Sequence, residues 1–193
     1  IQIKSVGDET FNYRKSEWSP VYEYVLNSTP LYCRIINDNE YEIKPANPTE
    51  LSGTIVLPSA INGLPVTTIS PSAFKGATKL TSIIIPDSVT SIGQYAFMYS
   101  RSLRSIKLPE NITVIETGTF SYCTDLQSVE FNENLKTIGN QAFSYCGSLV
   151  EVVVPDSVET IGSEAFESSA MMSDSLESLF LGENLKTIGD KAF

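Results

Sequence analysis

The sequence predicts a repeat solenoid, a fold in which one short coil is copied and each copy is stacked on the previous one. Phenylalanine recurs every 23 residues from Phe74 to Phe166, and again at Phe193 after 27 residues. Isoleucine and leucine keep the same steps: Ile69, Ile92, Ile115, Ile138, Ile161 and Ile188; Leu80, Leu103, Leu126, Leu149 and Leu176. A unit of this length cannot bury its own apolar side, so stacked copies must cover one another.

Each unit reads L-x-x-I-x-I-P-x-x-V-x-x-I-G-x-x-A-F, and its first half predicts two short extended segments. Residues 80–85 end in the alternation of a short strand. Pro86 cannot donate a ladder hydrogen bond, so it ends that strand. A second apolar pair, Val89 and Ile92, predicts a short extended segment on the opposite side of the coil.

The second half of the unit predicts turns. Glycine follows the extended segment in most units, as at Gly93, and suits a turn that needs a positive φ. The pair Ala96–Phe97 predicts a tight helical turn that sends one small and one large side chain inward. Parallel strands stacked in this way advance by roughly 4.8 Å per unit, so the units form an elongated slab.

These motifs resemble the BspA-type leucine-rich repeat of bacterial and protist surface proteins, from about Leu31 to Phe193. The resemblance implies a right-handed coil with short parallel β-strands on a concave face. Turns, short extended segments and helical turns would form the convex side.

The repeat divides the chain into three predicted regions. Residues 1–30 fall outside the pattern, and we expect a cap or the remnant of a preceding segment. Residues 31–50 alternate around a polar tip and predict a β-hairpin. Residues 51–193 hold six repeats, the last one truncated, with four extra residues in the segment ESSAMMSDS. The chain starts without Met and ends within the pattern, so we expect a piece of a longer protein.

Three positions depart from the repeat. Glu116 replaces the glycine, with Gly118 two residues later, so that turn should differ in shape. Asn132 and Gly182 replace the proline, so we expect those strand ends to be less firmly stopped.

Composition and charge exclude several functions. The net charge of −10 disfavours nucleic acid and anionic lipid, and no apolar run is long enough to insert in a membrane. Histidine is absent, and with it the commonest general base and transition-metal ligand. The chain has neither a nucleophile elbow nor a phosphate-binding glycine loop. We therefore predict no enzymatic activity, no catalytic or metal-binding residues and no cofactor.

Stacking turns each repeat position into a column of residues, so a binding site should be sought in columns. Positions between the buried strand residues face the concave side. The candidate protein-binding face there consists of Ile84, Lys107, Glu130, Val153 and Phe180, with Val56 at one end and a neighbouring column of mainly serine. The alternative is a solvated sheet whose β-branched residues merely favour strands.

Three other columns have a functional and a structural interpretation. Carboxylates at Asp87, Glu110, Glu133, Asp156 and Glu183 could hold cations, although exposed-turn residues beside them favour a solvated edge. Cys123 and Cys146 share a column and could form a disulfide, but buried free thiols fit better because stacked side chains point the same way. Tyr99, Tyr122 and Tyr145 could stack on a sugar or simply pack over the phenylalanines.

The repeat and the resemblance together predict a cell-surface or secreted recognition and adhesion module that binds a host or bacterial surface protein. The alternative is a structural spacer that presents another domain. We also expect end-to-end self-association through the open C-terminal repeat. Met171–Met172 in the inserted segment are a further candidate contact with a partner.

Overall fold

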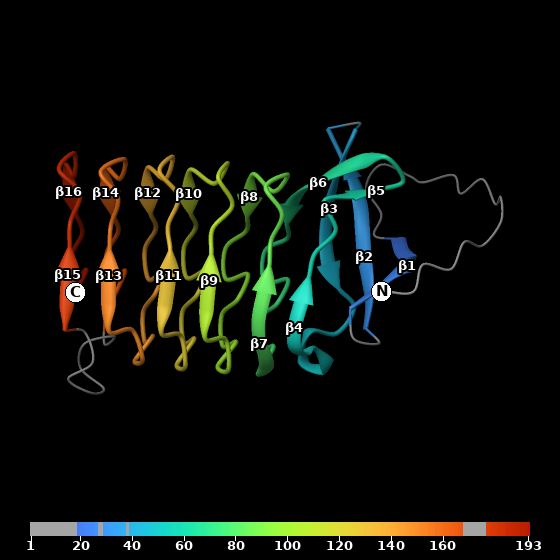
Figure 1. The fold of residues 1–193 in the computed structure, drawn as a ribbon, viewed down its shortest axis with the longest axis horizontal. Coiled ribbons are helices and arrows are strands. Elements are labelled where there is room, and N and C mark those ends of the chain that lie inside the picture. Colours follow the sequence, from blue (N-terminus) through green and yellow to red (C-terminus); the bar gives the residue numbers. More distant parts are fainter. Residues whose placement is uncertain (1–18, 27–28, 38, 168–176) are drawn as a thin grey trace.

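The computed structural model describes residues 19–26, 29–37, 39–167 and 177–193, with side chains described from Leu26 onward. Within these ranges the chain winds into coils that follow one another along a single axis (Figure 1). Each coil contributes one strand to each of two rows on opposite sides of the core. The repeat solenoid predicted from the spacing is therefore confirmed.

The first strand row lies on the face predicted to be concave. Its strands are β4 (Ser52–Val56), β7 (Lys79–Ile84), β9 (Ser105–Lys107), β11 (Ser128–Glu130), β13 (Glu151–Val153) and β15 (Ser178–Phe180). Three parallel pairs, β4–β7, β9–β11 and β13–β15, form ladders. Strand β7 also lies beside β9, and β11 beside β13, so the row is continuous along the axis.

The second strand row lies across the core from the first. It consists of β6 (Leu64–Ile69), β8 (Ser91–Ile92), β10 (Val114–Ile115), β12 (Thr137–Ile138), β14 (Thr160–Ile161) and β16 (Thr187–Ile188). Parallel pairing joins β6 to β8, and joins β10, β12, β14 and β16 in sequence. Ile138 pairs with Ile161 and Ile161 with Ile188, so the row keeps its register across the four-residue insertion.

An antiparallel sheet precedes the first coil. Strands β1 (Ser19–Leu26), β2 (Thr29–Ile36) and β3 (Glu40–Pro45) pair in order, and β2 and β3 form a hairpin in the region, residues 31–50, where the sequence predicts one. Strand β3 then pairs in parallel with β6, and the short strand β5 (Ala60–Ile61) pairs antiparallel with β6. The hairpin therefore begins the second strand row. A single 3₁₀ turn, η1 (Pro48–Glu50), connects it to β4.

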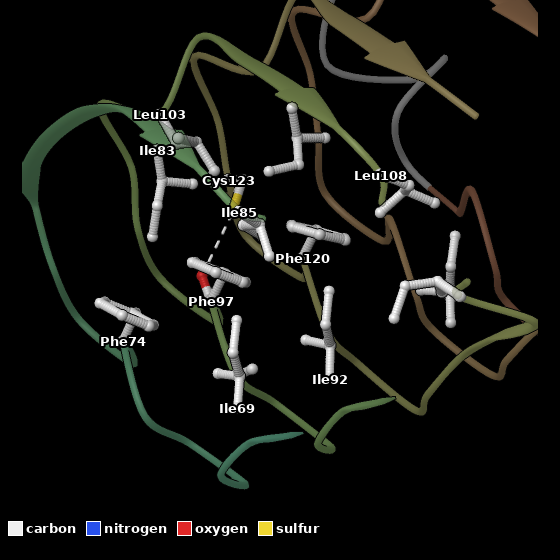
Figure 2. Close-up of a cluster of buried hydrophobic side chains, with 14 of the residues drawn as sticks. Ile69, Phe74, Ile83, Ile85, Ile92, Phe97, Leu103, Leu108, Phe120 and Cys123 are labelled. Atoms are coloured by element: carbon white, nitrogen blue, oxygen red, sulfur yellow. Dashed lines mark hydrogen bonds between the residues drawn. The ribbon is translucent and has the colours of Figure 1, made fainter. Parts of the chain in front are cut away.

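A file of stacked phenylalanine rings occupies the centre of the core. Successive ring centroids from Phe74 to Phe193 are 5.0, 5.3, 5.3, 5.2 and 5.4 Å apart. Adjacent rings lie within 9° of parallel. Isoleucines of both strand rows and Leu103 and Leu108 pack around them (Figure 2). The rings repeat at nearly the spacing of stacked strands, roughly 4.8 Å, so each coil lies directly on its predecessor.

The repeat glycine has a different role from the one predicted. Gly93, Gly139, Gly162 and Gly189 do not have a positive φ. They are required because a Cβ at Gly139 would lie 2.6 Å from the carbonyl oxygen of Ile115 in the preceding coil. The positive φ occurs two residues later, at Tyr95, Gly118, Gln141, Glu164 and Lys191. In the unit where Glu116 replaces the repeat glycine, Gly118 occupies this left-handed position, which glycine adopts more easily than other residues.

The predicted helical turns on the convex side are turns of another kind. The N–H groups of Ala96, Met98 and Ser100 donate to the carbonyl three residues earlier in the same coil. The N–H groups of the residues between them donate to the next coil instead. Phe97 N–H, for example, donates to Thr119 O at 2.8 Å. Left-handed residues such as Tyr95, with φ of 58°, reverse the chain between these turns and prevent a helix from continuing.

The strand ends without proline are held firmly, contrary to expectation. Asn132 is buried, and its Nδ2 donates to Pro109 O at 2.6 Å and Ile112 O at 3.0 Å. Its Oδ1 accepts from Asn134 N at 2.8 Å. At Gly182, a Cβ would lie 2.3 Å from Pro155 O, so glycine there permits close stacking.

We predict that Gly139→Ala destabilises the fold by about 2–3 kcal/mol, because the added methyl overlaps a backbone carbonyl that cannot move aside. Gly76→Ala is the matched control. Gly76 has a φ of +74° and open space around its Cβ position, so only left-handed strain applies, about 1 kcal/mol. Urea denaturation followed by circular dichroism measures both. An equal or smaller loss for Gly139→Ala would contradict the close-contact role.

Candidate functional site

The candidate protein-binding face is the outward-pointing column of the first strand row. Alternation along β7 shows how it arises: Ile83 and Ile85 are 5% and 8% exposed, whereas Ile84 between them is 53% exposed. Register then places equivalent residues side by side. Val56 pairs with Ile84, Lys107 with Glu130, and Val153 with Phe180. The structure thus brings all the predicted residues of this face into one column.

Apolar side chains occupy both ends of this face and are half exposed. Val56 is 51% exposed, Val153 is 53% exposed and Phe180 is 57% exposed. Phe180 lies on the last strand of the row and has a strand neighbour on one side only. Ile84 and Val153 lie inside the row, so their exposure comes from the face itself. Adjacent exposed apolar residues of this kind are typical of contact sites.

An ion pair occupies the middle of the face. Lys107 Nζ donates to Glu130 Oε1, and both side chains are about two-thirds exposed. The hydrogen bond and the charge of Glu130 raise the pKa of Lys107, with smaller contributions from the carboxylates of Glu110 and Asp87. Because the pair is exposed and screened, it contributes little to folding and can reorient toward a partner.

A mostly small polar column borders the face. It consists of Thr54, Ser82, Ser105, Ser128, Glu151 and Ser178. Short side chains here leave the neighbouring apolar residues uncovered. A flat partner surface could therefore contact Ile84 and Val153 directly.

The acidic column is a set of hydrogen-bonded turns. Asn111, Asn134 and Asn184 each donate through Nδ2 to the backbone carbonyl of the acidic residue in the preceding coil, at 2.9–3.0 Å. Asp156 Oδ1 accepts from Glu183 N at 2.9 Å. Among the described residues, no group of three His, Cys, Asp or Glu side chains could hold a metal ion. The arrangement matches the solvated-edge interpretation.

The three cysteines are free and buried. Cys123 Sγ donates to Phe97 O at 3.2 Å (Figure 2). Cys146 Sγ donates to Phe120 O at the same distance. Ser100 makes the same bond to Phe74 O at 2.9 Å, which explains why either serine or cysteine can occupy this column. Burial raises the pKa of Cys146 to about 12 and that of Cys33 to about 11.

Tyr99, Tyr122 and Tyr145 form a tyrosine ladder on the convex side. Ring centroids are 4.8 Å apart between Tyr99 and Tyr122 and 4.4 Å apart between Tyr122 and Tyr145. Desolvation of the phenol, followed by the effect of Tyr145, raises the pKa of Tyr122. Since the rings cover one another, their outer edges are the surfaces that solvent reaches. The ring faces therefore pack against one another, and the two interpretations, packing over the phenylalanines and stacking on a sugar, both remain predictions.

Two predicted features lie outside the described residues. They are the Met171–Met172 segment and most of the predicted cap, residues 1–18. No helix in the described ranges is long and apolar enough to cross a membrane.

One known protein family matches most of this chain. The sequence profile described as BspA type Leucine rich repeat region matches residues 54–173 with six copies. The chain belongs to the BspA-type leucine-rich repeat family. This confirms the resemblance seen in the sequence. A search of curated protein sequences found no match.

Solved structures contain the same BspA-type coil. A leucine-rich repeat protein from T. pallidum is 32% identical, with a TM-score of 0.70 over 81% of this chain and 82% of that chain. One from Bacteroides ovatus is 26% identical, with a TM-score of 0.70 over 93% of this chain and 44% of that chain. A leucine rich cell surface protein from Faecalibacterium prausnitzii is 24% identical and shows the fold alone, with a TM-score of 0.59 over 96% of this chain and 52% of that chain.

The sequence interpretation missed one group on the BspA-type solenoid. Four exposed basic residues lie at the start of β7 and on the turns that lead into β7 and β9: Lys75, Lys79, Arg101 and Arg104. The net charge of the whole chain, −10, gives no sign of a local group of basic residues. Counting charge repeat by repeat would have revealed them.

We predict that the buried thiols make the protein lose stability above about pH 9. Below the pKa of an unfolded cysteine, both states hold the proton and stability is unaffected. Above it, only the unfolded state ionises until the folded pKa of Cys146, about 12, is reached. Each such thiol then costs up to about 1.4 kcal/mol per pH unit.

Chemical denaturation of wild type and Cys123→Ser/Cys146→Ser between neutral and alkaline pH measures this effect. Serine keeps the hydrogen bond that Ser100 already makes in the same column. The double variant should lose less stability than wild type as the pH rises. Parallel curves for the two proteins would contradict the prediction.

Proposed function

We propose that this chain is a non-enzymatic recognition module that binds a protein partner through the face formed by Ile84, Lys107, Glu130, Val153 and Phe180. One observation carries the proposal. Apolar side chains stand half exposed at both ends of a column on a regular strand row, with an exposed ion pair between them. Rows of parallel strands in stacked repeats form extended surfaces that suit protein contacts.

The face would bind by covering its apolar ends. Burying the exposed half of a Val or Ile side chain contributes about 1 kcal/mol. The Lys107–Glu130 pair would fix the orientation of the partner, because charged groups in an interface set specificity more than affinity. We also propose a location at the cell surface or outside the cell, because the repeats resemble those of bacterial and protist surface proteins.

The test compares two variants of the full chain. Ile84→Asp/Val153→Asp places charges at both ends of the face, and Val114→Asp alters an exposed valine on the second strand row. Immobilised wild type is exposed to extracted surface proteins, and the bound proteins are identified by mass spectrometry. We expect a specific protein that wild type and Val114→Asp retain and Ile84→Asp/Val153→Asp loses by about tenfold or more.

Melting temperatures of all three proteins control for folding. Equal retention by all three would show that this face is not the site. Capture of nothing specific by wild type would favour the structural-spacer alternative.

We also propose that a polypeptide of residues 1–193 associates end to end. Its last coil exposes Leu181, Ile188 and Phe193, and β15 and β16 each have a partner strand on one side only within the described rows. Unpaired parallel edges beside apolar residues favour pairing with another chain.

Light scattering after size exclusion should show an apparent mass that rises with concentration. Ile188→Lys should hold the protein as a monomer, because edge lysines oppose strand pairing. A constant monomeric mass for wild type would contradict this proposal and would leave the proposed binding face unaffected.

A further inference from the structure

A basic patch lies on the edge of the solenoid where the chain turns into the first strand row. It consists of Lys75, Lys79, Arg101 and Arg104, all of them exposed. Lys79 is the first residue of β7, and Arg104 immediately precedes β9. Arg104 N donates to Thr81 O at 3.2 Å and Gly76 N to Met98 O at 2.8 Å, so the two coils that carry the patch are hydrogen-bonded neighbours.

The patch contrasts with the charge of the rest of the chain. Residues 74–116 contain five Lys or Arg against three Asp or Glu. Residues 117–193 contain three against twelve. Residues 1–73 contain five against eight, so residues 74–116 are the part of this acidic chain with a net positive charge.

The four cations of the patch have no carboxylate partner among the described residues. Elsewhere on the solenoid, Lys107 pairs with Glu130 and Lys186 with Glu159. Asp125 lies in the coil after Arg101 and donates its backbone N–H to Arg101 O at 3.1 Å, but its carboxylate forms no ion pair with any residue that the structure describes. The patch can therefore bind an external anion without first breaking an ion pair within the described ranges.

The tyrosine ladder continues directly from this patch. The Arg101 guanidinium carbon lies 5.7 Å from the centroid of the Tyr99 ring, so Arg101 links the cations to the ladder. Tyr99, Tyr122 and Tyr145 all have left-handed backbones, with φ of 63°, 60° and 59°. Gly76 fills the same position in the preceding coil at φ 74°. Bulky residues are unfavourable there, so the backbone alone does not account for three tyrosines.

We propose that the basic patch and the tyrosine ladder together bind an anionic polysaccharide. The cations attract its sulfate or carboxylate groups, and the phenol edges supply hydrogen bonds and apolar contact to the sugar rings. A single polysaccharide chain can follow the two basic coils and the ladder. A duplex nucleic acid or an anionic vesicle is wider than a single polysaccharide chain and would bring more of its negative charge against the acidic coils. This site is separate from the proposed protein-binding face.

Isothermal titration calorimetry of the full chain with a heparin oligosaccharide of defined length tests the proposal. Over the range from about 50 to 200 mM NaCl, log K against log salt should have a slope of about −3, as expected for four displaced counterions. Lys79→Gln/Arg104→Gln should weaken binding about tenfold and reduce that slope by about half. Lys136→Gln/Lys191→Gln removes the same charge from the acidic coils and should leave binding unchanged.

A second variant tests the ladder. Tyr99→Gly keeps a backbone that glycine already adopts at position 76, and it removes the ring beside Arg101. It should weaken heparin binding severalfold without lowering the melting temperature. Double-stranded DNA and vesicles of phosphatidylcholine with phosphatidylserine serve as competing polyanions and should bind more weakly than heparin.

Several results would overturn the proposal. The first is absence of heparin binding at low salt. The second is an equal loss of heparin affinity in Lys79→Gln/Arg104→Gln and Lys136→Gln/Lys191→Gln. The third is an unchanged heparin affinity of Tyr99→Gly together with DNA or vesicle binding as tight as heparin binding. A salt-sensitive doubling of mass without ligand would assign the patch to a second copy of the chain instead.

Discussion

The vertical stacking of identical coils is the constraint on which this structure depends. The phenylalanine file measures it directly, because parallel rings 5.0–5.4 Å apart leave no room for a coil to shift sideways. Every other repeated contact is a consequence of that alignment. Glycine lets two backbones approach, Ser100 and the two stacked thiols bond the carbonyls of the preceding coil, and asparagines bind the turns together.

Much of this fold could be predicted from the sequence because stacking imposes a period on it. The strand rows, the central phenylalanines and the alternation that exposes Ile84 all follow from spacing alone. The role of the glycines could not be predicted in the same way. A residue needed for a left-handed backbone and a residue needed for close approach look identical in a sequence, and only the position of Ile115 O relative to Gly139 distinguishes them.

The departures from the repeat show the same limit. Asn132 replaces the proline that ends the strand in other units, which predicts a less firmly stopped strand end. Its side chain nevertheless donates hydrogen bonds to two carbonyls of the preceding coil. Such a bond depends on where the previous coil places its oxygen atoms, which the pattern within one unit does not contain. The candidate binding surfaces could be predicted only in part from the sequence. Their columns were predictable, whereas the gathering of unpaired cations on two coils required the charges to be placed in space.

The register across the inserted segment has a further consequence. Thr160 still pairs with Thr187 and Val153 with Phe180, although 27 residues separate these partners where neighbouring coils have 23. The pairing of the strands is therefore the same whether 23 or 27 residues separate one coil from the next at this edge. A connection at this edge can therefore gain four residues, and with them new surface, while the architecture stays intact.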